Sequence, residues 1–250
     1  MAMLNTFRSE LTKALTLRSI QATLLAAVLV PPLLAFFSGL AFDPTRTASG
    51  GFPVESHGFE TAGFGQPIII LFAALLVGTE YLDAQVRTTL IATPSRARIF
   101  GAKLMITALL SAVVAALSTA VAVLLKHAVL DDHGLDLGQF STAMAWNLLG
   151  VIVNYSLLGL IAASATMIMR NYIAAIVVLV PMVLGLTISL VGAIPLLKFL
   201  PDLAGIQLLT AYPGIGLLES IHGALVMMIW ALGLGIIGWW LFSTRDVGTS

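Results

Sequence analysis

The sequence has no cysteine and few charged residues: 10% of its 250 residues are Asp, Glu, Lys or Arg. Without cysteine the chain can form neither disulfide bonds nor thiolate metal sites. Soluble domains carry roughly 25% charged residues. The deficit here, together with 59% hydrophobic residues and a mean hydropathy of +1.02, indicates a membrane protein. The formal net charge of zero gives no overall positive field and does not favour binding to nucleic acid.

Catalytic and nucleotide-binding motifs are also absent. The sequence contains no Gly-x-x-x-x-Gly-Lys-Ser/Thr phosphate loop, no His-Glu-x-x-His zinc motif and no Gly-x-Ser-x-Gly nucleophile elbow. The spacing of the four histidines matches no standard set of metal ligands. We therefore expect neither an enzyme nor a metal site, and no binding of ATP through a phosphate loop.

Long apolar runs dominate what is present. A helix needs about 20 apolar residues to cross a bilayer, and six stretches qualify or nearly qualify: 20–42, 61–80, 104–126, 141–169, 172–197 and 220–242. We expect an all-α polytopic membrane protein with residues 1–250 in one transmembrane domain. The first run is longer than the ~7–15-residue core of a signal peptide, so we expect a retained anchor.

The centres of these runs lack charged residues. No Asp, Glu, Lys or Arg occurs in residues 21–42, 61–79, 104–125, 141–169 and 171–197. Proton- or ion-driven carriers usually place ionisable groups near the bilayer midplane. The absence disfavours a proton-coupled carrier, although backbone carbonyls can bind sodium. The energy for any transport is then expected to come from another polypeptide.

The distribution of lysine and arginine predicts the orientation, because cytoplasmic loops carry the excess of these residues. With the N-terminus inside, nine of them fall on the inner side: Arg8, Lys13, Arg18, Arg87, Arg96, Arg98, Lys103, Arg170 and Arg245. Only three fall outside, namely Arg46, Lys126 and Lys198. Six spans return the C-terminus to the cytoplasm. We expect a multi-pass protein of the cell membrane with both termini inside.

Two segments outside the spans have helical character. Residues 1–19 carry apolar side chains at helical spacing with a basic face, which predicts an amphipathic helix in the membrane interface rather than an ordinary juxtamembrane tail. Its candidate residues are Phe7, Arg8, Glu10, Lys13 and Arg18. Residues 198–220 are too apolar for a solvated loop and too interrupted by proline and glycine for a span. We expect short re-entrant or outer-leaflet helices there.

A few polar and aromatic residues lie within the spans. Asn147 and Asn154 are seven residues apart and share a helix face. They could line a substrate pathway, but the pattern favours hydrogen bonds between helices. Trp230 falls near the middle of the last span, where it packs in the core or faces a pathway.

The segment 80–103 is the polar exception between two apolar runs. Asp83 and Arg87 are four residues apart and can pair along a helix, which Thr93-Pro94 should end. A basic inner loop that only fixes topology would explain the arginines. It would not explain the acidic and neutral polar residues among them. A helix with such a mixed surface is suited to a groove on a cytosolic protein.

This arrangement resembles the permease subunits of ABC transporters, in the family often called type 2 exporters. The resemblance lies in the entry segment 7–19, in the six-span plan with a broken apolar segment before the last span, and in the loop residues Glu80, Tyr81, Arg87, Thr88, Thr89, Leu90, Pro94, Arg96 and Lys103. The loop departs from the family pattern at Ala84, where glycine is expected, and at Asp83, where a basic or polar residue is commoner.

The resemblance implies two permease chains around a pathway, as a homodimer or with a related chain. It also implies separate cytosolic ATPase subunits that bind ATP and Mg, with no cofactor on this chain. A coupling helix around 80–92 would contact the ATPase through Glu80, Tyr81, Asp83, Arg87, Thr88, Arg96 and Lys103. Substrates of similar permeases range over drugs, antimicrobial peptides, lipids and sugar polymers, and the apolar spans here favour a hydrophobic or amphipathic one.

Two other functions fit the same sequence. A secondary transporter or channel would work without a partner, and its purified form would retain no ATPase. A membrane scaffold would recruit a cytosolic protein through 80–103 but show no substrate-stimulated ATP turnover.

Overall fold

The computed structural model describes residues 2–43, 53–82, 95–136, 139–210 and 217–245, and these form helices and turns with no strand among them. Six segments are long and apolar enough to cross a membrane, which confirms the prediction of an all-α polytopic membrane protein. They are Arg18–Leu40, Val54–Tyr81, Arg96–His133, Thr142–Met169, Tyr172–Leu190 and Ser220–Thr244.

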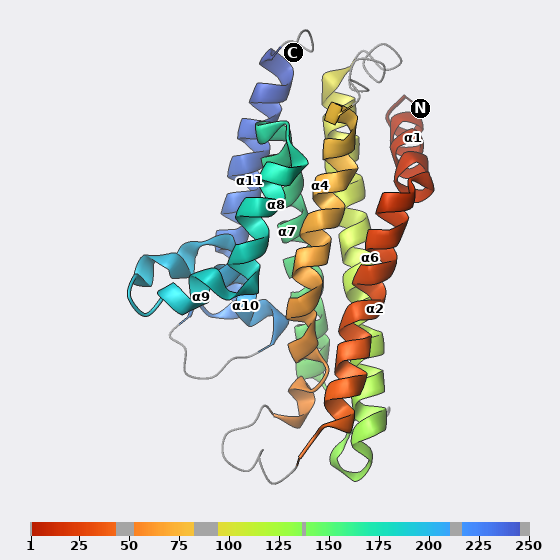
Figure 1. Ribbon diagram of the computed structural model, residues 1–250, viewed down its shortest axis with the longest axis vertical. Coiled ribbons are helices and arrows are strands. Elements are labelled where there is room, and N and C mark those ends of the chain that lie inside the picture. The colour runs from red at the N-terminus through yellow and green to blue at the C-terminus, as the bar shows by residue number, and fades with distance from the viewer. Residues whose placement is uncertain (1, 44–52, 83–94, 137–138, 211–216, 246–250) are drawn as a thin grey trace.

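The long helices lie side by side along the long axis of the molecule (Figure 1). They are α2 (Arg18–Leu40), α4 (Gln66–Leu82), α6 (Arg96–Leu130), α7 (Thr142–Met169) and α11 (Ser220–Thr244). Short 3-10 turns precede α4 and follow α6: η1 (Val54–Ser56), η2 (Phe59–Gly65) and η3 (Asp131–His133). We call "the terminal end" the end of the bundle that holds the last turns of α4 and α11 and the first turn of α6.

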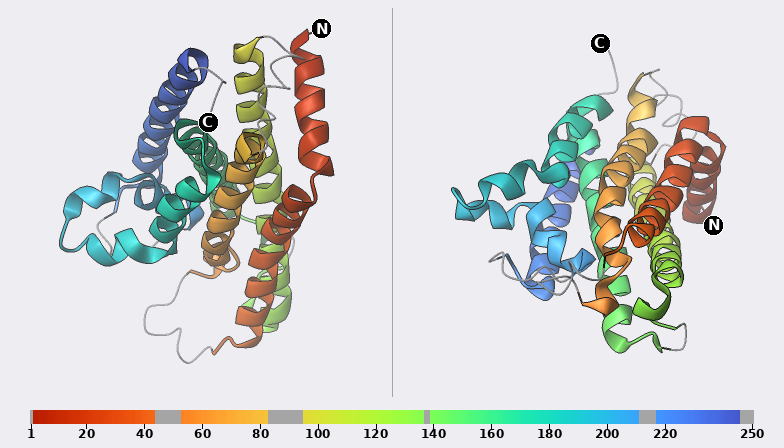
Figure 2. Two further views of the ribbon diagram at one scale, coloured as in Figure 1. Left: turned by 45° about the horizontal axis from the view of Figure 1, so that its top comes forward. Right: turned by 60° about the horizontal axis from the view of Figure 1, so that its bottom comes forward.

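The first helix, α1 (Ala2–Thr16), belongs to this terminal end. It is separated from α2 by Leu17, whose extended backbone (φ −73°, ψ 120°) breaks the helix. Both views in Figure 2 place α1 beside the first part of α6 and away from α8. The predicted helix within 1–19 is therefore present, and it is docked on the bundle.

The core is built around α7, whose buried face is rich in small residues. Gly159, Ala162 and Ala163 are on this face, and a Cβ on Gly159 would lie 2.6 Å from the Ser111 Oγ of α6. Small residues let membrane helices approach closely, and packing at short range is what drives their association in lipid. α7 consequently contacts α4, α6 and α11 at once.

The fifth span is shorter than the predicted 172–197. It consists of α8 (Tyr172–Pro181), a π-helical turn Met182–Leu186, and α9 (Thr187–Leu190). Gly185 has φ +113°, a conformation that glycine adopts without a Cβ clash, and the chain turns aside there instead of continuing straight. Figure 1 shows α9 directed away from the bundle.

The segment after α9 contains the short helices predicted for 198–220. They are η6 (Pro195–Phe199) and α10 (Pro201–Leu209). α10 is wedged between α7 and α11 at two glycines. A Cβ on Gly150 would lie 2.3 Å from the Leu208 carbonyl oxygen, and one on Gly223 would lie 1.9 Å from that of Ala204. Larger residues at either glycine would force α10 out.

Asn154 joins four helical segments at the base of this wedge. Its side chain is fully buried, accepts a hydrogen bond from Gln66 Nε2 (3.0 Å), and donates to the Gly205 carbonyl (2.9 Å). Its Nδ2 also lies 3.7 Å from Met227 Sδ. These contacts link α4, α7, α10 and α11, so Asn154 serves the interhelical hydrogen bonding that the sequence favours.

Replacing Asn154 by leucine should destabilise the bundle by about 1–3 kcal/mol, because Gln66 and the Gly205 carbonyl would be left buried without their partner. Thermal unfolding of the purified variant measures the loss. Asn147→Leu, at a half-buried position two turns away, is the matched control and should leave the midpoint close to that of the unchanged chain. Equal midpoints for both variants would contradict the role of Asn154.

Candidate functional site

Four charged side chains from three helices meet at the terminal end. Lys13 Nζ lies 2.7 Å from Glu10 Oε1 and 3.2 Å from Glu80 Oε1. Lys103 Nζ lies 2.6 Å from Glu10 Oε2 and 2.9 Å from Glu80 Oε1. Each lysine therefore contacts both glutamates. We call Glu10, Lys13, Glu80 and Lys103 the ion cluster.

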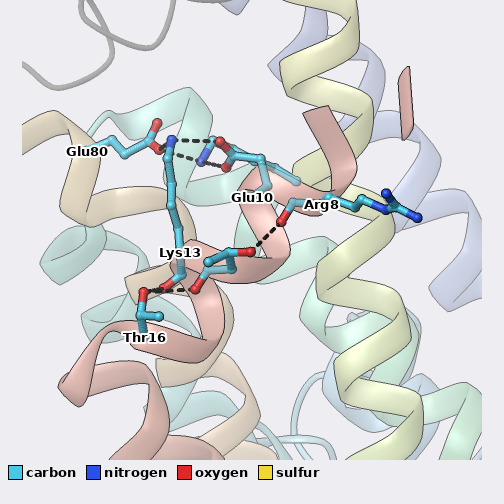
Figure 3. A network of polar contacts seen from close by, with 7 residues as sticks. Arg8, Glu10, Lys13, Thr16 and Glu80 are labelled. Carbon is cyan, nitrogen blue, oxygen red and sulfur yellow. Dashed lines mark hydrogen bonds and ion pairs between the residues drawn. The ribbon is translucent and has the colours of Figure 1, made fainter. Parts of the chain in front are cut away.

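Local sequence places each member of the ion cluster. On α1, residues Thr6, Glu10 and Ala14 are four apart, share one face, and are all buried. Glu80 lies in the last turns of α4, and Lys103 lies two turns into α6, which begins at Arg96 and not at the predicted 104. Figure 3 shows Lys13 extending from α1 to Glu80.

Burial makes these charges interdependent. The side chains of Glu10, Glu80 and Lys103 are 4%, 8% and 6% exposed, whereas that of Lys13 is 40% exposed. The charges balance within the ion cluster, two positive against two negative. Removing one partner from a buried pair leaves an uncompensated charge, which typically costs about 3–5 kcal/mol. The cluster therefore resists separation of α1 from α4 and α6.

The pKa values on α1 reflect this balance. Burial alone would raise the pKa of Glu10, but the charges and hydrogen bonds of Lys103 and Lys13 outweigh it and hold the pKa below its usual range. Burial would likewise lower the pKa of Lys13, but Glu10 and Glu80 raise it above its usual range. Both shifts favour the charged forms of Glu10 and Lys13 at neutral pH.

A second set of contacts joins helix ends at the terminal end. Arg96 Nη1 donates to the carbonyl oxygens of Phe242, Ser243 and Arg245 at 2.9, 3.0 and 2.9 Å. The last carbonyls of a helix have no partner within it and carry partial negative charge, so an arginine there is stabilising. Arg245 Nη1 donates in turn to the Ile168 carbonyl near the end of α7 (3.0 Å). α6, α7 and α11 are thereby held together.

The predicted coupling residues divide into two groups. Glu80 and Lys103 lie within the ion cluster, Arg96 binds the end of α11, and Tyr81 is half-buried against the core. These four make contacts within the chain. The other predicted coupling residues, Asp83, Arg87 and Thr88, fall in 83–94 and lie outside the described residues.

The predicted interfacial residues of α1 also have distinct positions. Phe7 packs against the core, Glu10 and Lys13 belong to the ion cluster, and Arg8 and Arg18 are exposed. Leu4 and Leu15 are 53% and 48% exposed, three turns apart on the same stripe of the helix. α1 thus buries one face on the bundle and leaves Leu4 and Leu15 exposed, and its place in the membrane interface stays a prediction.

The three candidate pathway residues have different surroundings, and their role in a pathway stays a prediction. Asn154 is fully engaged between helices, as described above. Trp230 Nε1 donates to the Phe199 carbonyl (2.8 Å) and ties α11 to η6. Asn147 is half-buried and lines a pocket between α7, α10 and α11.

Sequence reasoning missed the bonds of Arg245 and the pairing within the ion cluster. An arginine directly after an apolar span is a signal for binding to helix-end carbonyls, although the partner helix cannot be read from it. Within the described residues, no group of three or more His, Cys, Asp or Glu is placed to hold a metal.

Substituting Lys103 by methionine should destabilise the chain by about 3–5 kcal/mol, because two buried glutamates would then share the single half-exposed Lys13. The double variant Glu80→Gln, Lys103→Met restores neutrality and should recover most of that loss. Thermal unfolding of both variants provides the comparison. A double variant no more stable than Lys103→Met would show that the charges are not coupled.

Acid should release α1 from the bundle. Since the pKa of Glu10 in the folded chain is below its unfolded value, ionised Glu10 stabilises docking above the unfolded value. That contribution is lost as the pH falls from the unfolded value through the lower folded-state pKa. Fluorescence anisotropy of a probe on Ser9→Cys, in a chain without other cysteines, follows the release. Glu10→Gln should abolish the acid transition, and Glu219→Gln, at an exposed site, should preserve it.

A comparison with protein families agrees with this arrangement. A model described as ABC-2 family transporter protein matches residues 6–195, about three quarters of the chain, which includes most of α1, the ion cluster and the first five spans. No curated protein sequence matches the chain. The chain belongs to the ABC-2 family and is a transmembrane subunit of an ABC transporter.

Proposed function

We propose that this subunit exports a hydrophobic or amphipathic substrate across the cell membrane, driven by separate cytosolic ATPase subunits. A second permease chain, identical or related, completes the pathway. ATP and Mg bind to the ATPases, because this chain has no phosphate loop. The terminal end faces the cytoplasm, as the excess of lysine and arginine there favours.

The observation that carries this proposal is the position of the ion cluster. Residues 83–94 connect α4 to α6, and Glu80 and Lys103 lie on those two helices just before and after the connection. Glu10 and Lys13 attach α1 to both. A force applied to 83–94 by a partner would therefore act on α1, α4 and α6 together.

The energetics favour movement of these helices as one unit. Pulling α1 away alone would expose or unpair Glu10 and separate it from Lys103, at a cost typical of a broken buried ion pair, about 3–5 kcal/mol. Rigid-body rotation leaves the ion cluster intact and changes contacts elsewhere, such as those of the bent fifth span. Closure of the ATPases would then rock the bundle between two states, which ATP and substrate stabilise differently.

One feature favours the alternative of an ion-driven carrier. Asp202 on α10 is a buried carboxylate that accepts a hydrogen bond from Thr187 Oγ1. Burial raises its pKa. Buried ionisable groups of this kind bind protons or ions in carriers that work without ATP. The experiment below separates the two functions.

The tagged chain, purified in mild detergent, should retain an ATPase whose sequence contains a phosphate loop. Arg87→Glu, in the predicted coupling helix, should lose that ATPase while the chain still inserts and purifies normally. Arg18→Glu, an exposed position on another segment, is the control and should retain it. ATP hydrolysis in the eluate and identification of the bound protein are measured.

A chain that purifies alone under conditions that preserve membrane complexes would overturn the ATP-driven function and favour the carrier. If Arg87→Glu retains the ATPase as well as the unchanged chain does, the ATP-driven function stands, but 83–94 is not the segment that couples the chain to the ATPase. Glu80 is unsuitable for this test, because its reversal would also disrupt the ion cluster.

A further inference from the structure

A pocket of about 470 Å³ lies between α7, α10 and α11, remote from the ion cluster. Its volume is within the range of about 300–1,000 Å³ typical of small-molecule sites. Large hydrophobic side chains around it are exposed, among them Trp146 (68%), Ile221 (75%) and Leu225 (53%). In a membrane-spanning chain, such surface is covered by lipid or by another protein.

The wedge of α10 creates this pocket. Its carbonyls pack directly on Gly150 of α7 and Gly223 of α11, which holds those two helices apart at this level. Leu208 of α10 forms part of the lining, and the space beyond it is left between α7 and α11. The pocket therefore follows from the tight packing of the α10 backbone on α7 and α11.

Polarity changes along the pocket. Asn147 lies in the second turn of α7 and Ser220 is the first residue of α11, so both polar groups are near the starts of their helices. Exposed Trp146 adjoins them, and tryptophan is enriched at the level of lipid headgroups. Val153 and Met228 line the pocket at least one turn further along their helices; Met228 is about 12 Å beyond Ser220 at 1.5 Å per residue.

We propose that this pocket binds one acyl chain of a membrane lipid, with its polar head at Asn147 and its tail directed toward Met228. The Ser220 hydroxyl at the same end donates to the Gln207 carbonyl (2.8 Å), which leaves the Asn147 amide as the donor to the lipid head. The polar end lies where the helices begin and the apolar end lies nearer mid-membrane, which is the orientation of a lipid in that leaflet. No Asp, Glu, Lys or Arg is among the residues that line this pocket, so a lipid head at its polar end would be held by hydrogen bonds and not by ion pairs. A zwitterionic lipid therefore fits better than a lipid bound through its charge.

This site goes beyond the proposed function and needs no ATPase to be tested. The chain is reconstituted in phosphatidylcholine nanodiscs that contain a small fraction of phosphatidylcholine with a diazirine in one tail. After illumination, labelled peptides are quantified by mass spectrometry. Peptides that contain 146–153 and 221–228 should be labelled more heavily than the lipid-facing surface of α2, and excess unlabelled lipid should compete.

Leu225→Trp fills the pocket and should reduce the labelling there by about tenfold. This is the loss of affinity expected when roughly two methylene groups of the lipid tail can no longer be buried in the pocket. Leu232→Trp is the matched control, because Leu232 is 60% exposed, two turns along the same face, and outside the pocket. It should leave the labelling unchanged. Met228→Trp provides a second filling variant should Leu225→Trp fail to fold.

Two results would overturn the proposal. One is labelling of the pocket peptides no greater than that of α2 in the unchanged chain, which needs no variant. The other is equal loss of labelling in Leu225→Trp and Leu232→Trp, which would show that the substitution acts on the helix surface in general.

Discussion

The ion cluster is the interaction on which the terminal end depends. Two glutamates and two lysines neutralise each other in a largely buried site, and no one of them can leave without exposing the others to an unpaired charge. Their contacts join α1 to α4 and α6, the two helices that residues 83–94 connect. Arg96 extends the same end to α11 through helix-end carbonyls. A partner that binds at the terminal end would thus meet several helices already held together.

Elsewhere in the bundle, one buried polar junction and close packing at glycines hold the helices together. Asn154 satisfies Gln66 and the Gly205 carbonyl at the level where α10 enters the bundle. Glycines at 150 and 223 let the backbone of α10 approach α7 and α11 directly. The fifth span turns aside at Gly185 and leads the chain into this wedge. The ion cluster and the wedge therefore organise opposite parts of the chain, one through charge and the other through close packing.

Hydropathy was sufficient to predict six spans, because each needs only a long apolar run. It did not predict where α6 begins, since Arg96 and Lys103 lower the local hydropathy although both lie in the helix. A linear pattern also does not predict the contacts of Lys103 within the chain, because it shows charge but not the opposite charge of Glu10, 93 residues away on α1. The coupling role of Glu80 and Lys103 stays a prediction. The turn at Gly185 depends on a positive φ that composition alone does not predict.

We propose that α1 and the first turns of α6 move as one unit during transport. Spin labels on Ser9→Cys and Ala97→Cys, both exposed positions in a chain without other cysteines, report the distance between them by double electron–electron resonance. In the complex with its ATPase, the distance distribution should remain unchanged between the nucleotide-free and ATP-bound states. A second distribution that appears with ATP only, in which α1 has separated from α6, would contradict the account.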